Sequence, residues 1–101
     1  MVIKASKKIF DDNIEIIVSG HACYGPYGQD IVCSAVSSLF YTLYFSLDEL
    51  TNDKVNVDFA DDFSKIIIKN ISDNGRLLVS SFFIGIREIA SSYPNHVSII
   101  E

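Results

Sequence analysis

The chain has 101 residues, of which 49% are hydrophobic and 21% are charged, and these proportions exclude a disordered or low-complexity protein. Eight basic and thirteen acidic residues give a net charge of −5, which argues against direct binding to a nucleic-acid backbone. The length predicts a single domain over residues 1–101. The N-terminal segment has no apolar core typical of a secretory signal, so we expect a cytoplasmic protein with reduced thiols.

The first elements expected along the chain form a β-hairpin. Two β-rich runs, 2–8 and 14–18, flank the polar turn 11–13. A segment with three glycines and one proline, 20–29, follows the hairpin and is expected to be a loop.

A long helix is expected next, from about residue 31 to residue 50. Its apolar side chains recur at intervals of three and four, and Asp30 stands where an N-cap residue should be. Residues 31–47 carry no charge, which is just short of the roughly 20 residues that span a membrane. Five of them are Ser or Thr, spaced like one face of a helix, so we favour a buried amphipathic helix and expect no membrane partner.

The second half of the chain predicts two strands, a second helix and a last strand. Alternation marks a strand over 55–59, and three consecutive isoleucines suggest that a strand over 64–71 is covered on both faces. Asn74-Gly75 is expected to close that strand, before a helix over about 76–93 and a strand over 96–100. The order ββαββαβ predicts an α+β fold, a two-layer sandwich of two helices on a mainly antiparallel sheet.

Both expected helices carry more apolar surface than one small sheet covers. Aromatic residues surround the first helix at positions 40, 41, 44 and 45. Either they pack into a tight core with some rings exposed, or the leftover helix surface forms the interface of a homodimer. We favour the homodimer.

The candidate for chemistry is the segment that joins the hairpin to the first helix. His21 follows the expected strand directly, and Cys33 is the third residue of the expected helix. A helix N-terminus lowers the pKa of a thiol, and a nearby imidazole completes the pair that covalent acyl transfer requires. Exposed N–H groups there, that of Cys33 included, can hold an oxyanion. From the residues alone, a core cysteine and a surface histidine remain the more common interpretation.

Two other interpretations of the cysteines have less support. Cys23, Cys33, His21 and His96 are the potential zinc ligands, but no paired ligand spacing connects them. We therefore expect no metal and no cofactor. A redox sensor that uses Cys23 and Cys33 is a further alternative, although the chain lacks a C-x-x-C motif.

The run GHACYGPYGQDIVCSAVS, Gly20 to Ser37, resembles the signature of the ribosomal-processing cysteine protease family, Prp. The rest of the chain is similar in outline, including the closing segment 90–99. The resemblance implies a small homodimeric enzyme that removes an N-terminal extension from a bacterial large-subunit ribosomal protein, cutting after an aromatic residue. It also implies that His21 and Cys33 form the catalytic dyad.

The family pattern also contains the residues found here as Gly20, Asp30 and Ser37, for which plainer roles compete. Gly20 lets the strand turn into the loop. Asp30 either caps the helix or orients His21, and we prefer capping because a carboxylate opposes ionisation of a thiol. Ser37 is either a hydrogen-bonding partner of the loop or the histidine, or simply an exposed helix serine.

The loop is expected to fold over the substrate. Gly25 and Gly28 would be its hinges, and Tyr24 and Tyr27 would line an aromatic pocket. Cys23 stands where the family more often has a small residue, and we treat it as a spectator.

The expected partner is the basic ribosomal protein with its extension. Residues 48–62 hold six acids and one lysine, which would steer such a protein, although charged segments are usually just solvated. The alternative function is a non-catalytic dimeric escort or binding protein in ribosome assembly.

Overall fold

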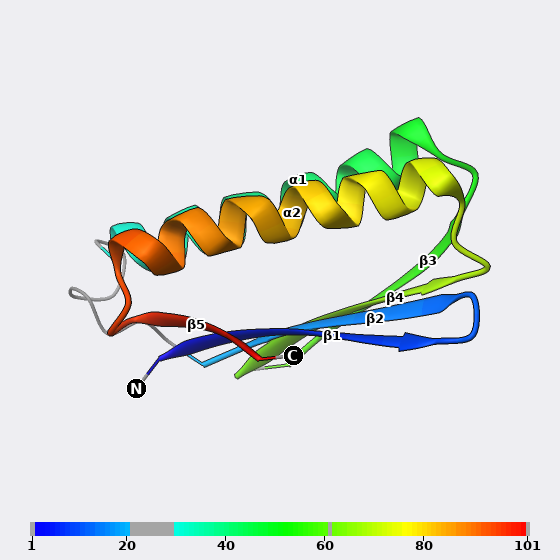
Figure 1. The fold of residues 1–101 in the computed structure, drawn as a ribbon. Coiled ribbons are helices and arrows are strands. Elements are labelled where there is room, and N and C mark those ends of the chain that lie inside the picture. Colours follow the sequence, from blue (N-terminus) through cyan, green and yellow to red (C-terminus); the bar gives the residue numbers. More distant parts are fainter. Residues whose placement is uncertain (1, 21–29, 61, 101) are drawn as a thin grey trace.

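The computed structural model describes residues 2–20, 30–60 and 62–100, which form a sheet with two helices laid along one of its faces (Figure 1). The elements follow the predicted order ββαββαβ, so the expected α+β sandwich is confirmed. In chain order they are β1 (Ile3–Phe10), β2 (Asn13–Ser19), α1 (Ile31–Leu50), β3 (Lys54–Phe59), β4 (Phe63–Lys69), α2 (Asp73–Ser92) and β5 (Val97–Ile100).

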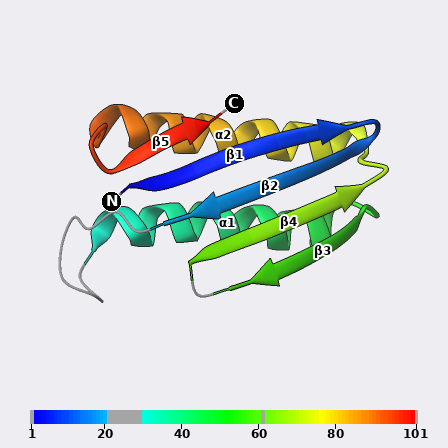
Figure 2. The same cartoon turned by 90° about the horizontal axis from the view of Figure 1, so that it is seen from below.

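The sheet has five strands in the order β3-β4-β2-β1-β5. Three of the four pairings are antiparallel, and β5 runs parallel to β1, with Ile3 opposite Val97. Because the chain returns to the sheet through α2, the last strand lies beside the first (Figure 2). The sheet is thus mainly antiparallel, as predicted, with one parallel pair at its edge.

The core lies between the sheet and the helices. Side chains alternate along each strand, so Ile14 and Ile16 on β2 and their partners Ile68 and Ile66 on β4 all face the helices and are buried. The helices contribute the buried residues Val32, Val36, Phe40, Leu43 and Leu47 from α1, and Gly75, Val79, Phe82 and Ile86 from α2.

Helix α1, which contains the uncharged run 31–47, is long and apolar enough, by length and composition, to cross a membrane. Its buried stripe nevertheless packs on the sheet and on α2, as the core helix of a two-layer fold does. In the described fold, residues 31–47 therefore belong to an amphipathic helix that buries one side against the sheet and α2.

Strand β4 differs from the prediction. Both helices lie on one face of the sheet, so Ile66 and Ile68 are buried while Ile67 is only half-buried on the opposite face (Figure 1). The expectation that this strand is covered on both faces was wrong, because side chains alternate along a strand and both helices cover the same face.

The start of α2 also differs from the prediction. The helix begins at Asp73, so Asn74 and Gly75 belong to its first turn and do not close the preceding strand. Ser72 is the N-cap, and its side chain accepts a hydrogen bond from the Gly75 amide at 3.0 Å. Gly75 is buried where a Cβ would collide with the side chains of Asp53 and Ile71, so close packing explains this glycine.

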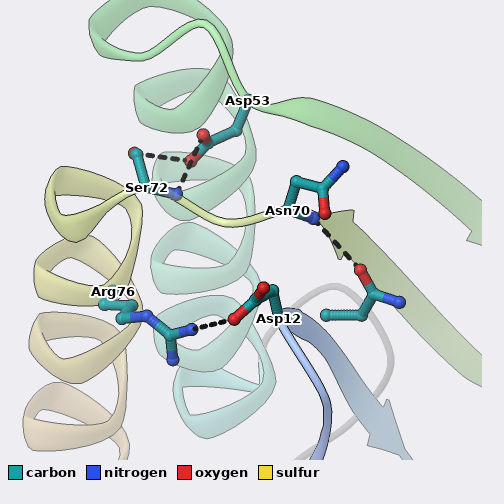
Figure 3. Close-up of polar contacts among 6 residues, drawn as sticks. Asp12, Asp53, Asn70, Ser72 and Arg76 are labelled. Carbon is teal, nitrogen blue, oxygen red and sulfur yellow. Dashed lines mark hydrogen bonds and ion pairs between the residues drawn. The ribbon is translucent and has the colours of Figure 1, made fainter.

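Polar contacts fix this end of the molecule (Figure 3). The Ser72 amide and hydroxyl donate to the Asp53 carboxylate at 3.0 and 2.9 Å. Arg76 Nη2 lies 3.7 Å from Asp12 Oδ1, and the Asn70 amide donates to Asn13 Oδ1 at 3.0 Å. The start of α2 is thereby connected to the β1–β2 turn and to the residue that precedes β3.

Candidate active site

Asp30 is the N-cap residue of α1, as the sequence predicts. Its carboxylate oxygen Oδ1 accepts hydrogen bonds from the amides of Val32 and Cys33, each at 3.0 Å. The side chain is buried, with 8% of Asp30 exposed. These bonds satisfy two of the amides that a helix leaves unpaired at its start.

This cap changes one expectation about the oxyanion. The Cys33 amide already donates to Asp30, so it is engaged in the cap and does not point to an incoming oxyanion as proposed from the sequence. An oxyanion bound at this place therefore has to use other donors.

Cys33 is the third residue of α1 and is half-buried. It lines a hollow of about 180 Å³ between the start of α1 and the adjoining ends of the strands. Gly20 and Ser37, two of the residues singled out from the sequence, line the same hollow. The fold thus gathers three of the predicted site residues around one space.

Gly20 has a structural reason to be glycine. Its φ is +86°, in the left-handed region, and a Cβ there would collide with the carbonyl oxygen of Val2. Its amide donates to the carbonyl of Asp62 at 3.0 Å. The end of β2 is therefore held against β1 and against the β3–β4 connection, immediately before His21.

Ser37 lies one helical turn after Cys33 and is exposed. It lines the Cys33 hollow and also a second, open hollow along the outer side of α1, together with Tyr41 and Phe45. Its position is therefore shared between two adjoining surface depressions.

Several predicted residues lie outside the described part of the chain. They are His21, Cys23, Tyr24, Gly25, Tyr27 and Gly28. The dyad, the hinges and the aromatic pocket accordingly stay predictions.

Sequence reasoning missed one wall of the hollow. Ala60, Asp62, Phe63 and Ser64, from the β3–β4 connection and the start of β4, line it opposite α1. The sequence predicts a turn at Asp61-Asp62 before β4. It does not predict that these residues approach Cys33, because that approach depends on the order of the strands.

Metal binding finds no support in the parts of the chain that the structure describes. Residues 2–20, 30–60 and 62–100 contain no group of three or more His, Cys, Asp or Glu side chains placed to hold an ion. The chemistry that these residues offer is that of a half-buried thiol at a capped helix start.

Comparison with protein families and with known proteins shows which family the chain resembles. The model of the family described as Cysteine protease Prp matches residues 2–98. A ribosomal processing cysteine protease Prp of Mycoplasma genitalium is 32% identical over 90 residues, covering 85% of this chain and 86% of that protein. The protein of that name from Staphylococcus aureus is 23% identical over 88 residues, covering 84% and 83%.

Solved structures share the fold. The S. aureus protease Prp in complex with a covalently linked product peptide superposes with a TM-score of 0.89 at 21% identity, covering 97% of each chain. SMU.848 from Streptococcus mutans gives a TM-score of 0.80 at 30% identity, covering 97% of this chain and 91% of that one.

These matches define the class of the protein as a cysteine protease. More particularly, the chain belongs to the cysteine protease Prp family.

Proposed function

We propose that the protein is an endopeptidase that removes the N-terminal extension of a bacterial large-subunit ribosomal protein, with Cys33 as nucleophile and His21 as acid and base. The observation that carries the proposal is the position of Cys33, third in a capped helix and open to a hollow that Gly20 and Ser37 also line. The names of the M. genitalium and S. aureus relatives support ribosomal processing.

The helix start suits the first chemical step. The helix dipole places a partial positive charge at the start of α1, which favours the thiolate of Cys33. Beyond the cap Asp30, the first turn contains no acidic residue. The thiolate attacks the scissile carbonyl, and the tetrahedral intermediate collapses to a thioester as His21 protonates the departing amine.

The second step regenerates the enzyme. Water attacks the thioester carbonyl while His21 takes its proton, and the carboxylic acid product leaves as the Cys33 sulfur is released as thiolate. Structures of the S. aureus relative contain a covalently linked product peptide and a substrate peptide. They support a peptide as the substrate in this proposal.

The remaining features are assigned by the same proposal. The loop with Tyr24, Gly25, Tyr27 and Gly28 closes over the peptide, and the acidic segment 48–62 attracts the basic substrate. The active form is a cytoplasmic homodimer, supported by the exposed apolar side chains that α2 leaves, Leu77 and Ile84 among them.

The decisive experiment uses the ribosomal protein of the same organism with its extension intact. Cys33→Ala and His21→Ala are each expected to slow cleavage by at least about a thousandfold, measured by intact mass spectrometry. Cys23→Ala is the matched control and is expected to cleave at the wild-type rate. Wild-type cleavage by Cys33→Ala would reject the mechanism, and a cell that grows normally with Cys33→Ser would favour a non-catalytic escort.

A further inference from the structure

Three stacked aromatic rings lie on the surface along the middle of α1 and at the end of β3. Tyr41 stacks on Phe59 of β3, with centroids 5.9 Å apart and planes at 30°, and on Phe45 at 6.5 Å and 25°. We call Tyr41, Phe45 and Phe59 the aromatic shelf. The buried ring of Phe40 supports the shelf from below, edge-on to Tyr41 and Phe59 at 6.0 and 6.2 Å.

The rings of the shelf stack on one another, yet about half of each residue is exposed to solvent. Tyr41, Phe45 and Phe59 are 46%, 55% and 50% exposed. A contiguous exposed apolar patch of a few hundred Å² is often functional on a protein surface.

The shelf adjoins the hollow that contains Cys33. Ser37 lines that hollow and also the open hollow with Tyr41 and Phe45. Cys33, Ser37 and Tyr41 follow one another at intervals of four residues, so they lie along one side of α1. Phe59 directly precedes Ala60, which lines the Cys33 hollow from the opposite side.

The spacing fits an extended peptide. Eight residues of helix separate Cys33 from Tyr41, which corresponds to about 12 Å along the axis. An extended peptide advances about 3.3 Å per residue, so this length covers three to four residues.

We propose that the aromatic shelf is a second substrate subsite, which binds a large apolar side chain three or four residues from the scissile bond. This inference rests on the proposed function, since it takes Cys33 as the attacking group. The bound side chain lies on the rings of Tyr41 and Phe59, and the peptide passes Ser37 on its way from Cys33.

A substrate peptide is favoured over a second copy of the chain for two reasons. The shelf is continuous with the Cys33 hollow through Ser37. Three half-exposed rings also offer only about 300 Å², whereas a standard protein interface buries about 800 Å² on each partner.

The test compares the double variant Tyr41→Ala/Phe59→Ala with wild type on a peptide that the wild-type protein cleaves. A second set of peptides carries alanine, one position at a time, from two to five residues on each side of the scissile bond. The double variant is expected to lose about tenfold in kcat/KM on the parent peptide, mainly through KM. The peptide with alanine three or four residues from the scissile bond should be cleaved more slowly than the parent peptide by wild type. The wild-type protein and the double variant should cleave this alanine peptide at the same rate.

Controls separate the subsite from other effects. Phe10→Ala removes an exposed aromatic ring from the end of β1 that lies away from the Cys33 hollow, and it is expected to change neither peptide series. The alanine scan on the wild-type protein needs no variant to fold, and alkylation of Cys33 by iodoacetamide should stay the same in every variant.

Several results would overturn the inference. One is an unchanged kcat/KM for the double variant, and another is an alanine scan without a sensitive position at that distance. If wild type is a dimer, the double variant is a monomer, and kcat/KM falls equally on all peptides, then a second copy of the chain occupies the shelf. A wild-type protein that cleaves no peptide or extended ribosomal protein would reject the proposed function, and this subsite with it.

Discussion

The two helices begin at opposite ends of the molecule, and their starts are built differently (Figure 2). At α2, the cap Ser72 is itself held by Asp53, and Asp73 supplies a negative charge in the first turn. At α1, the cap Asp30 is followed by a first turn without acids, and the third residue is a thiol beside a hollow. Both ends use the same capping physics, so a capped start alone does not mark a site. The residue placed after the cap makes the difference.

The largest expected effect concerns the Cys33 end. Gly20→Ala is expected to lower the free energy of unfolding by about 3 kcal/mol, because it adds a left-handed backbone penalty to a collision with the Val2 carbonyl. Urea denaturation measures the loss. Gly85→Ala is the control, since the three atoms nearest to its Cβ all belong to the movable side chain of Leu39. It should change stability by about 1 kcal/mol or less. Equal effects of the two substitutions would contradict this account of Gly20.

A smaller effect is expected at the other end. Ser72→Ala removes the cap of α2 and one donor to Asp53, and should cost about 1 to 2 kcal/mol. Ser80→Ala, on an exposed position of the same helix, should cost less than about 0.5 kcal/mol. Because the Ser72 end is structural, cleavage by the folded variant should equal that of wild type. A reduced kcat in Ser72→Ala would show that the two ends are coupled.

The smallest effect on stability is expected for Asp30→Ser, which keeps a capping oxygen and removes the negative charge. Stability should change by a few tenths of a kcal/mol, within the range of cap exchanges. Loss of the carboxylate favours ionisation of Cys33, so iodoacetamide should alkylate the thiol several-fold faster at neutral pH. If cleavage instead falls about a hundredfold while alkylation is unchanged, Asp30 orients His21 in addition to capping the helix.

The sequence predicts the seven elements in order, because hydrophobic periodicity and turn residues are local signals. It misplaces the start of α2, where Asn74-Gly75 reads as a turn. Gly75 is required there by its contact with Asp53 and Ile71, residues whose approach no local pattern reveals. The burial of Ile67 was overestimated for the same reason, since the side of the sheet that the helices cover is decided by the whole fold.

The residues of the candidate site that lie close together in the sequence were predictable. Gly20, Asp30, Cys33 and Ser37 fall within a single motif, and a strand followed by a capped helix brings three of them to one hollow. The opposite wall at Ala60 and Phe63 was not predictable, because those residues reach Cys33 only through the pairing of β4 with β2.

The parallel pairing of β1 with β5 has a consequence for the order of folding. Ile3 lines the Cys33 hollow and also pairs with Val97, near the other end of the described chain. Contacts between residues so far apart close large loops and form late. The local hairpin and the helices are therefore expected to form first, and the edge of the sheet at Ile3 is completed only when β5 docks. The Cys33 hollow therefore adjoins, through Ile3, the part of the sheet that is expected to close last.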